Sequence, residues 1–218
     1  MHIGVLGTGT VGRTLAQALV DRGHEVRMGA RQAGNEKAVA WAEQAGPLAS
    51  EGSFADAAAI GELIFNATAG TASLEALRAA GAEQLAGKVL VDVANPLDAS
   101  NGFPPTLSVC NDDSLGESIQ RAFPDVRVVK ALNTVTADLM VRPSLVPGTH
   151  TMFVCGDDGA AKDQARLLLE EFGWPAGSIL DLGDITNARG MEMYVALWVR
   201  LYGALGSAVF NVELRAAQ

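Results

Sequence analysis

The stretch GTGTVG, with Gly7, Gly9 and Gly12, places the strongest constraint on how this chain can fold. It follows an apolar run, HIGVLG (2–7), and leads into VGRTLAQALVDRG (11–23), whose apolar residues share one face of a helix. In such a strand, turn and helix, the first glycine permits the tight turn, the second lets the backbone approach a pyrophosphate, and the third lets the helix pack on the strand. The free N–H groups at the start of the helix attract the phosphates. The spacing therefore predicts a dinucleotide-binding unit.

Short β runs alternate with alanine-rich helical segments through the first half of the chain, which is typical of parallel βαβ units. The elements that we expect are strands at 2–7, 25–30, 62–67, 88–95 and 126–133, a helix at 35–45, a strand, helix and strand at 149–156, 160–172 and 178–183, and a closing helical segment at 188–214. The sequence thus predicts an α/β fold: a Rossmann-type, doubly wound, mainly parallel sheet with a strand–helix–strand extension and a C-terminal helical segment.

Two parts of the chain follow from this pattern. We expect a nucleotide-binding domain at 1–183, with its core at 1–133, and a helical C-terminal segment at 184–218. The connection at 96–112 contains proline, glycine and serine without a period, and loops of this length are often functional. Ser114 and Glu117, three residues apart, then predict the capped start of another helix.

Charge and cysteine content exclude several classes of protein. The net charge of -9 argues against nucleic acid as a partner, because binders of nucleic acid need a basic surface. Cys110 and Cys155 form no CxxC motif, so neither a zinc site nor a disulfide is predicted and we expect a cytoplasmic protein. The apolar stretch from Tyr194 to Val212 has Arg200 near its middle, which predicts a buried helix rather than a membrane span.

The second predicted strand ends in a cation. In VRMGARQ (26–32), Arg31 stands where an acidic residue would bind the ribose 2′-hydroxyl of NAD. A guanidinium favours a 2′-phosphate instead, through a charge-assisted hydrogen bond of about 1.5–3 kcal/mol, or roughly one to two decades of affinity. The sequence therefore predicts NADP(H) as the cofactor. Lys37 offers either a second cation for that phosphate or a solvated helix face, and both interpretations stay open.

Three segments, FNATAG, DVANPL and VVKALNT, follow or end the other predicted strands. Ligands of open parallel sheets bind at the carboxyl ends of the strands, so we expect these segments to line the cofactor crevice. The candidate binding residues there are Asn66, Ala67, Thr68, Ala94, Asn95, Pro96, Leu97, Ala131 and Asn133. This set contains no nucleophile, histidine base or carboxylate pair. Asp157 and Asp158 suit a helix cap better than a metal, and no metal site is predicted.

The missing proton donor constrains the reaction. Reduction of a carbonyl to an alcohol usually needs such a donor, whereas hydride transfer between two ring systems needs mainly alignment. A redox cofactor as the acceptor therefore fits better than a carbonyl substrate. Two alternatives stay open: a small carbonyl or imine reductase, although 188–214 contains no catalytic lysine, and a protein that senses the redox state of NADP(H) without turnover.

Several segments carry a family resemblance: MHIGVLGTGTVGRTLAQALVDRGHEVRMGAR, VDVANPL, VVKALNT, FVCGDD with the helix after it, and ARGMEMYVALWVRLYGALGSAVFNVEL. Over nearly the whole chain they resemble the NADPH-dependent coenzyme F-420 reductases and the related oxidoreductase domain of the STEAP metalloreductases. The resemblance implies that NADPH is held by Ala30, by Arg31 and by the glycine loop, which comprises Gly7, Thr8, Gly9, Thr10, Val11 and Gly12. It also implies a deazaflavin (coenzyme F-420) or flavin (FMN or FAD) stacked near 95–97 and 131–135, and a homodimer to which the last helix contributes.

Asn133 marks a departure from part of that family. The archaeal F-420 reductases that this sequence resembles carry histidine at this point of the VVKALNT motif, whereas asparagine is typical of the STEAP-like and bacterial relatives. Either side chain can donate a hydrogen bond to a ring carbonyl. Asn133 and Asn95 are therefore the candidate catalytic residues, with F-420 as the first candidate acceptor and flavin or ferric reduction as the alternative.

Overall fold

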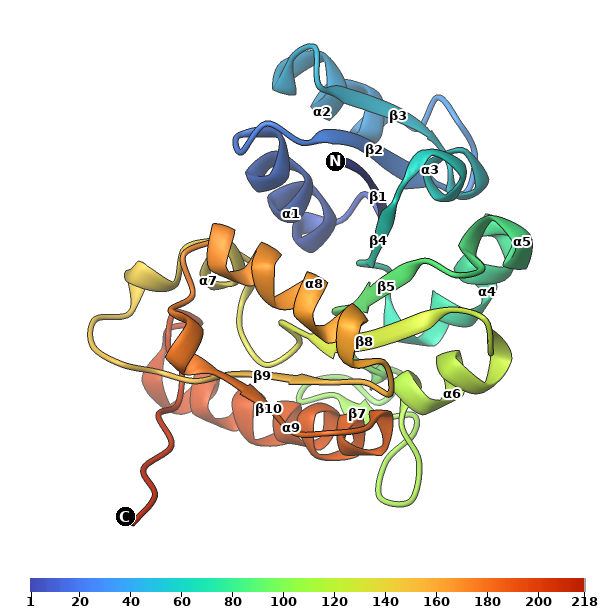
Figure 1. Cartoon of the computed structure of the whole chain (residues 1–218). Helices are drawn as coiled ribbons and strands as arrows, with labels where there is room; N and C mark the ends of the chain where they lie inside the picture. The colour runs from blue at the N-terminus through green and yellow to red at the C-terminus, as the bar shows by residue number, and fades with distance from the viewer. Residues whose placement is uncertain (218) are drawn as a thin grey trace.

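The computed structural model describes residues 1–217. The strands of its main sheet are β1 (His2–Leu6), β2 (Glu25–Ala30), β3 (Ala49–Ser53), β4 (Leu63–Asn66), β5 (Val89–Asp92), β8 (Arg127–Ala131), β9 (Met152–Cys155) and β10 (Ile179–Asp181). Their order across the sheet is β10-β9-β8-β5-β4-β1-β2-β3 (Figure 1). All neighbouring strands are parallel except β8 and β9, which run antiparallel. The predicted doubly wound, mainly parallel sheet is confirmed.

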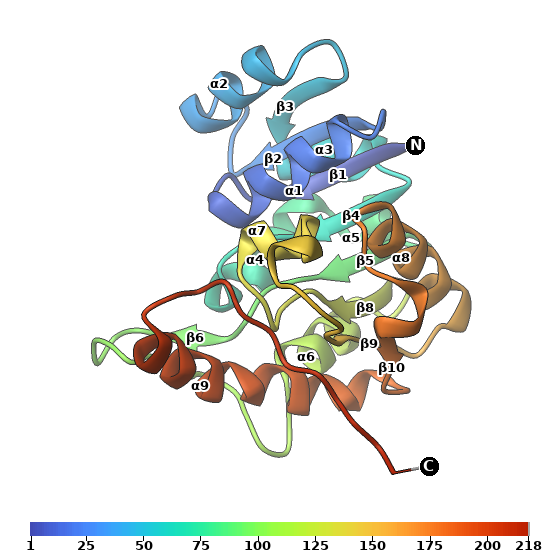
Figure 2. The same ribbon diagram turned by 90° about the vertical axis from the view of Figure 1, so that its left-hand side faces the viewer.

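Helices cover both faces of this sheet. They are α1 (Thr10–Val20), α2 (Glu36–Ala45), α3 (Phe54–Ile60), α4 (Ser73–Ala80), α5 (Ala82–Leu85), α6 (Leu115–Ala122), α7 (Ala137–Val141), α8 (Gly159–Glu171) and α9 (Ala188–Leu205). Buried residues of α1, α2, α7 and α8 form one hydrophobic core with the sheet, and those of α3 to α6 and α9 form the other. In Figures 1 and 2, α2 and α9 lie at opposite ends of the molecule.

Side chains fix the start of several helices where the sequence places polar residues. Asn35 caps α2 by accepting hydrogen bonds from the backbone of Lys37 and Ala38. Ser114 caps α6, as predicted, by accepting from the backbone N–H of Glu117 at 3.1 Å. Asp158 likewise caps α8, as predicted, by accepting a hydrogen bond from the backbone N–H of Ala161.

The structure contains elements that the sequence pattern did not predict. Strand β3 with helix α3 lies between the second and third expected strands, and helix α4 lies between the third and fourth. These segments are rich in alanine and glycine, so neither the helical nor the strand spacing of large apolar residues can be recognised in them. The connection at 96–112 also contains a two-stranded antiparallel hairpin, β6 (Leu97–Asp98) and β7 (Thr106–Leu107).

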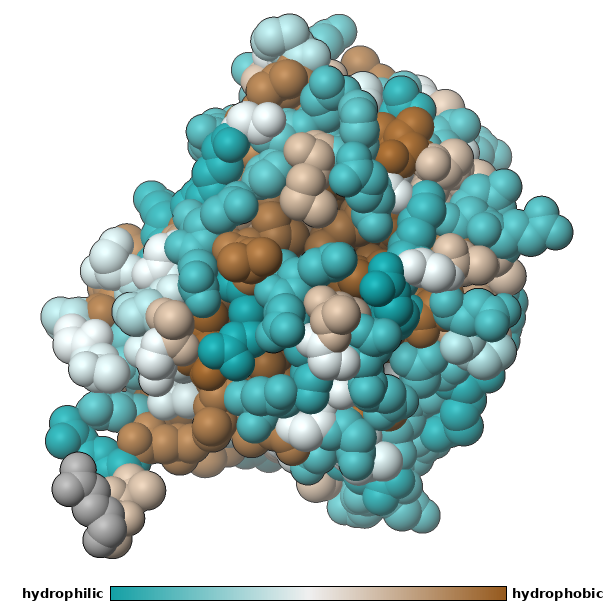
Figure 3. Space-filling view, in the orientation of Figure 1, coloured by the Kyte–Doolittle hydropathy of each residue, from teal (hydrophilic) through white to brown (hydrophobic). Residues whose placement is uncertain are grey.

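The closing helix is shorter and less buried than predicted. Helix α9 ends at Leu205, because Gly206 adopts a left-handed conformation with φ of 65° and the chain then continues without regular structure. Helix α9 lies on the outer side of the helices that cover one face of the sheet, so only one side of α9 is buried. The apolar residues exposed on α9 are Met193, Leu197, Tyr202 and Leu205. Figure 3 shows hydrophobic surface at the lower left, where the end of α9 lies in Figure 1.

Candidate functional site

The three glycines of GTGTVG, at the end of β1, differ in their surroundings. A Cβ on Gly12 would lie 2.1 Å from the carbonyl oxygen of Gly7, and a Cβ on Gly7 would lie 2.5 Å from the carbonyl oxygen of Ala67. These two positions therefore need glycine for close packing, and Gly7 also has a φ of +122°. Gly9 instead faces open space, with no atom within 4 Å of a Cβ placed there. It precedes α1, whose first N–H groups have no side-chain cap.

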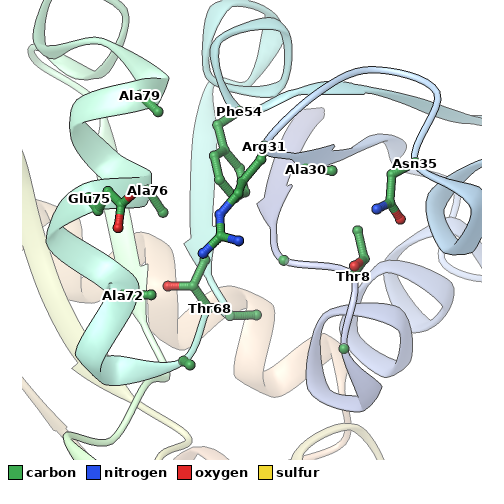
Figure 4. Close-up of a pocket in the computed structure, with 14 residues that line it drawn as sticks. Thr8, Ala30, Arg31, Asn35, Phe54, Thr68, Ala72, Glu75, Ala76 and Ala79 are labelled. Carbon is green, nitrogen blue, oxygen red and sulfur yellow. The ribbon is translucent and has the colours of Figure 1, made fainter.

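A first cavity of about 360 Å³ opens beside this loop. Its walls come from the ends of β1, β2 and β4 and from one side of α4: they are Gly7, Thr8, Gly9, Ala30, Arg31, Asn35, Phe54, Ala67, Thr68, Ala69, Ala72, Glu75, Ala76 and Ala79. Figure 4 shows Arg31 extending from the end of β2 into the space between α4 and the glycine loop. Phe54 and the alanines of α4 give this end of the cavity an apolar wall that suits a flat ring.

Arg31 and Lys37 are not equivalent in the structure. Arg31 lines the first cavity together with Asn35, the residue that caps α2. Lys37 is the second residue of α2 and lines a separate hollow with Arg13 and Trp41. Of the two cations considered from the sequence, only Arg31 therefore borders the cavity beside the glycine loop.

A second cavity, of about 440 Å³, continues from the first along the carboxyl ends of the strands. It shares Ala67, Thr68 and Ala69 with the first cavity. Its other lining residues are Thr10, Val11, Gly70, Val93, Ala94, Asn95, Leu97, Asn133, Val135, Thr136, Ala137 and Met140. None of these side chains ionises, so polar contacts inside this cavity come from hydroxyl groups, amides and the backbone.

Asn95 and Asn133 are joined by two hydrogen bonds at the second cavity. The side chain of Asn133 donates to Asn95 Oδ1 at 2.9 Å, and Asn95 Nδ2 donates to the backbone carbonyl of Asn133 at 2.8 Å. Asn133 Nδ2 also donates to the carbonyl of Met191 in α9 at 3.0 Å, which fixes the orientation of its amide. The preceding residue, Leu132, is buried with a left-handed φ of 63°. Asn133 Oδ1 is buried and has no partner among the described residues.

A buried ion cluster lies under this site. Lys130, fully buried in β8, places its Nζ 2.7 Å from Asp92 Oδ2 and 2.7 Å from Glu192 Oε1. Burial alone would lower the pKa of the Lys130 ammonium, but the two carboxylates outweigh it and hold this pKa above its ordinary value. Glu192, from α9, also accepts hydrogen bonds from the backbone N–H groups of Leu115 and Gly116 at the start of α6.

The buried ion cluster was not predicted, although its three residues leave a signal in the sequence. A lysine within the apolar run VRVVKALN, an aspartate within KVLVDVAN and a glutamate within the apolar last helix are each unexpected in a core. Charges that are buried in this way are normally paired. None of the three residues stands at the end of a predicted strand, where we expected the site residues, and they come from separate elements of the chain.

Most of the candidate binding residues border one of the two cavities, but five do not: Gly12, Lys37, Asn66, Pro96 and Ala131. Within the glycine loop, Gly12 packs against the backbone of Gly7, and Asn66 and Ala131 are fully buried. Neither a group of three or more His, Cys, Asp and Glu side chains placed to hold a metal ion nor a helix long and apolar enough to cross a membrane occurs within residues 1–217.

The fold and the glycine loop define an α/β protein of the class that binds dinucleotides. The sequence profile of the family described as "NADP oxidoreductase coenzyme F420-dependent" matches residues 2–96. The chain is 52% identical to a candidate F420-dependent NADP reductase from Arthrobacter sp. FB24, with a TM-score of 0.92 over 98% of this chain and 99% of that one. It therefore belongs to the family of F420-dependent NADP oxidoreductases, and it is an NADP-dependent oxidoreductase.

Two more distant relatives are also similar. The metalloreductase STEAP3 of Rattus norvegicus is 33% identical over 194 residues, which cover 87% of this chain but 35% of STEAP3, so the chain spans about a third of that protein. A reductive aminase from Aspergillus terreus, whose structure is a complex with NADPH4, cyclohexanone and allyl amine, has a TM-score of 0.66 at 19% identity. That comparison covers 94% of this chain and 62% of the aminase, and it supports the fold alone.

Proposed function

We propose that this protein transfers hydride between NADP(H) and a flavin-like ring, with coenzyme F-420 as the first candidate acceptor. The observation that carries the proposal is the second cavity, whose lining contains no ionisable side chain. A reaction that needs a general acid would lack one there, whereas hydride transfer between two rings depends on alignment. Family membership independently supports NADP(H) as one partner.

The residues present fit the dinucleotide. The open space at Gly9 and the uncapped start of α1 would receive the pyrophosphate, and Arg31 would bind the 2′-phosphate. The nicotinamide would then occupy the second cavity, which Asn95 and Asn133 line. NADPH supplies the hydride when it is bound. The locked Asn95–Asn133 pair would hold the ring orientation without the need to rearrange.

The assay that tests this proposal is anaerobic oxidation of NADPH by the purified protein with F-420, FMN or FAD as acceptor. We expect rapid reduction of F-420 with NADPH and at least about tenfold slower reduction with NADH at equal concentration, because Arg31 favours the 2′-phosphate. Binding of NADPH without reduction of any of the three acceptors would contradict the proposal and would favour the sensor that does not turn over.

A second prediction concerns the pH dependence of turnover. No side chain that lines the second cavity titrates, so kcat for an acceptor that does not ionise in this range should vary less than about twofold from roughly pH 6 to pH 8. The measurement is kcat under saturating NADPH at several pH values in buffers of equal ionic strength. A bell-shaped profile would show that an enzyme acid and base take part and would argue for a carbonyl or imine reductase instead.

Flavin or ferric reduction is the second candidate function. It is favoured by the identity of 33% with the metalloreductase STEAP3 over most of this chain. In the same assay, this alternative predicts reduction of FMN or FAD, or of a ferric chelate in the presence of flavin, without reduction of F-420. A small carbonyl or imine reductase is less well supported, because α9 contains no lysine that could act as a catalytic cation.

Homodimer formation and a cytoplasmic location belong to the same proposal. The exposed apolar side chains Leu197, Tyr202 and Leu205 give α9 a surface that a second copy could cover. Cys110 and Cys155 are both free thiols, as expected in a reducing compartment. Burial raises the pKa of the Cys155 thiol to about 12, so it stays protonated and unreactive.

A further inference from the structure

Thr68 occupies the junction of the two cavities and is connected to the buried ion cluster. It borders both the cavity with Arg31 and the cavity with Asn133. Its hydroxyl lies 2.6 Å from Asn66 Oδ1, and Asn66 Nδ2 lies 2.8 Å from Asp92 Oδ1. A continuous chain of hydrogen bonds therefore joins Lys130 to a residue that faces the ligand.

The direction of each hydrogen bond in this chain is determined by the ion pair. Both oxygens of the Asp92 carboxylate accept hydrogen bonds: Oδ2 accepts from the Lys130 ammonium at 2.7 Å, and Oδ1 accepts from Asn66 Nδ2 at 2.8 Å. Asn66 must therefore point its NH₂ group toward Asp92, which turns its Oδ1 toward Thr68. An amide oxygen can only accept, so Thr68 must donate its hydroxyl proton to Asn66.

Thr68 is left as an acceptor for any ligand. Its remaining protein neighbour, Ser73 Oγ at 2.9 Å, can donate to it and uses at most one of its two lone pairs. Phosphate oxygens at neutral pH are mainly acceptors, so Thr68 does not serve the pyrophosphate. The adenine amino group and the free hydroxyl of the adenosine ribose are donors on the side of Arg31, and the nicotinamide carboxamide is a donor deeper in the second cavity. The hydroxyl groups of the nicotinamide ribose lie between these groups, next to the pyrophosphate, and so match the position of Thr68 at the junction of the two cavities.

We propose that Thr68 binds a hydroxyl of the nicotinamide ribose as a hydrogen-bond acceptor, and that Lys130 and Asp92 are positioning residues that impose this role through Asn66. The inference rests on the proposed binding of NADP(H). It assigns Thr68 to the nicotinamide half of the cofactor, and it gives the buried ion pair a part in how the ligand is held.

Titration calorimetry with two ligands tests the assignment. NADPH contains the nicotinamide ribose, whereas adenosine 2′,5′-bisphosphate contains only the adenosine half. Thr68→Val should raise the Kd of NADPH about 3- to 10-fold and leave the Kd of adenosine 2′,5′-bisphosphate within about twofold of wild type. Thr68→Ser, which keeps the hydroxyl, should bind both ligands as the wild type does. The assignment would be overturned if Thr68→Val raised the Kd of both ligands equally, or if it changed neither Kd.

A double-mutant cycle tests the role of the ion pair. Asparagine at position 92 can donate to Asn66, so Asp92→Asn frees the Asn66 amide to turn and present its NH₂ group to Thr68. We expect Asp92→Asn to raise the Kd of NADPH by the same factor as Thr68→Val does. The double variant should have a Kd no higher than that of either single variant. Additive effects on the Kd of NADPH, or loss of adenosine 2′,5′-bisphosphate binding in Asp92→Asn, would overturn the positioning role.

These outcomes are distinct from failure of the proposed function. If the wild-type protein binds neither NADPH nor adenosine 2′,5′-bisphosphate, the cofactor assignment itself is wrong. If it binds both and Thr68→Val changes neither Kd, the cofactor assignment stands and the role of Thr68 is wrong. Melting temperatures of all variants, measured without ligand, separate loss of affinity from loss of folded protein.

Discussion

Replacing Lys130 with methionine should lower the free energy of unfolding by about 3–5 kcal/mol, because it leaves the carboxylates of Asp92 and Glu192 buried without their cation. Both carboxylates lie 2.7 Å from the Lys130 ammonium, and all three side chains are at most 2% exposed. For a chain of this size, the loss corresponds to a melting temperature lower by roughly 6–20 °C. Thermal unfolding followed by circular dichroism measures the difference.

A matched control is the exposed ion pair between Arg142 and Asp138, whose side chains are 60% and 61% exposed. Arg142→Met should change the free energy of unfolding by less than about 0.5 kcal/mol, because solvent screens this pair. Adding Asp92→Asn to Lys130→Met should recover part of the lost stability, since one of the two unpaired charges is removed. A Lys130→Met protein as stable as the wild type would show that the cluster does not depend on its cation.

Arg31→Glu should reverse the cofactor preference. Loss of the charge-assisted hydrogen bond to the 2′-phosphate should weaken the binding of NADPH by roughly 10- to 100-fold, and repulsion by the new carboxylate adds to this loss of affinity. The same carboxylate can accept a hydrogen bond from the free 2′-hydroxyl of NADH, so binding of NADH should improve. The measurement is the ratio of the two dissociation constants at a fixed ionic strength near 0.15 M.

Lys37→Glu is the control for this experiment, because it reverses a charge of the same sign a few residues away. Lys37 borders a different hollow from the one that Arg31 lines. The ratio of NADPH to NADH affinity should therefore change by less than about threefold at that ionic strength, where solvent and salt screen exposed charges. If Lys37→Glu changes the ratio as much as Arg31→Glu does, both cations contact the phosphate and α2 must move on binding.

The sequence predicted the parts of the site that depend on local rules. The spacing of Gly7, Gly9 and Gly12 is set by a single turn, so the turn and the start of α1 could be located from it. Arg31 was found because the end of β2 lies a fixed distance beyond that turn. The strand ends that carry Thr68 and Asn133 followed from the rule that ligands bind at carboxyl ends of parallel strands.

Features that depend on contacts between distant segments could not be predicted in the same way. Lys130, Asp92 and Glu192 come from three separate elements and meet only when β5, β8 and α9 are packed. The antiparallel direction of β9 is set by the path of the chain after α7 and has no signature in the strand itself. The placement of Asn35 rather than Lys37 beside Arg31 depends on where α2 begins, which local patterns give only to within a few residues.

For the proposed hydride transfer, the reversal between β8 and β9 limits the directions from which an acceptor would approach. Because β9 and β10 run opposite to β8, their carboxyl ends lie on the opposite side of the sheet from the carboxyl end of β8. The second cavity therefore ends at Asn133 and α7. With the nicotinamide in the second cavity, as proposed, an acceptor ring would not continue along the sheet and would instead approach from the solvent side and lie against the face of the nicotinamide. Substituents on that ring would project outward, and the protein would discriminate little among acceptors that differ only there.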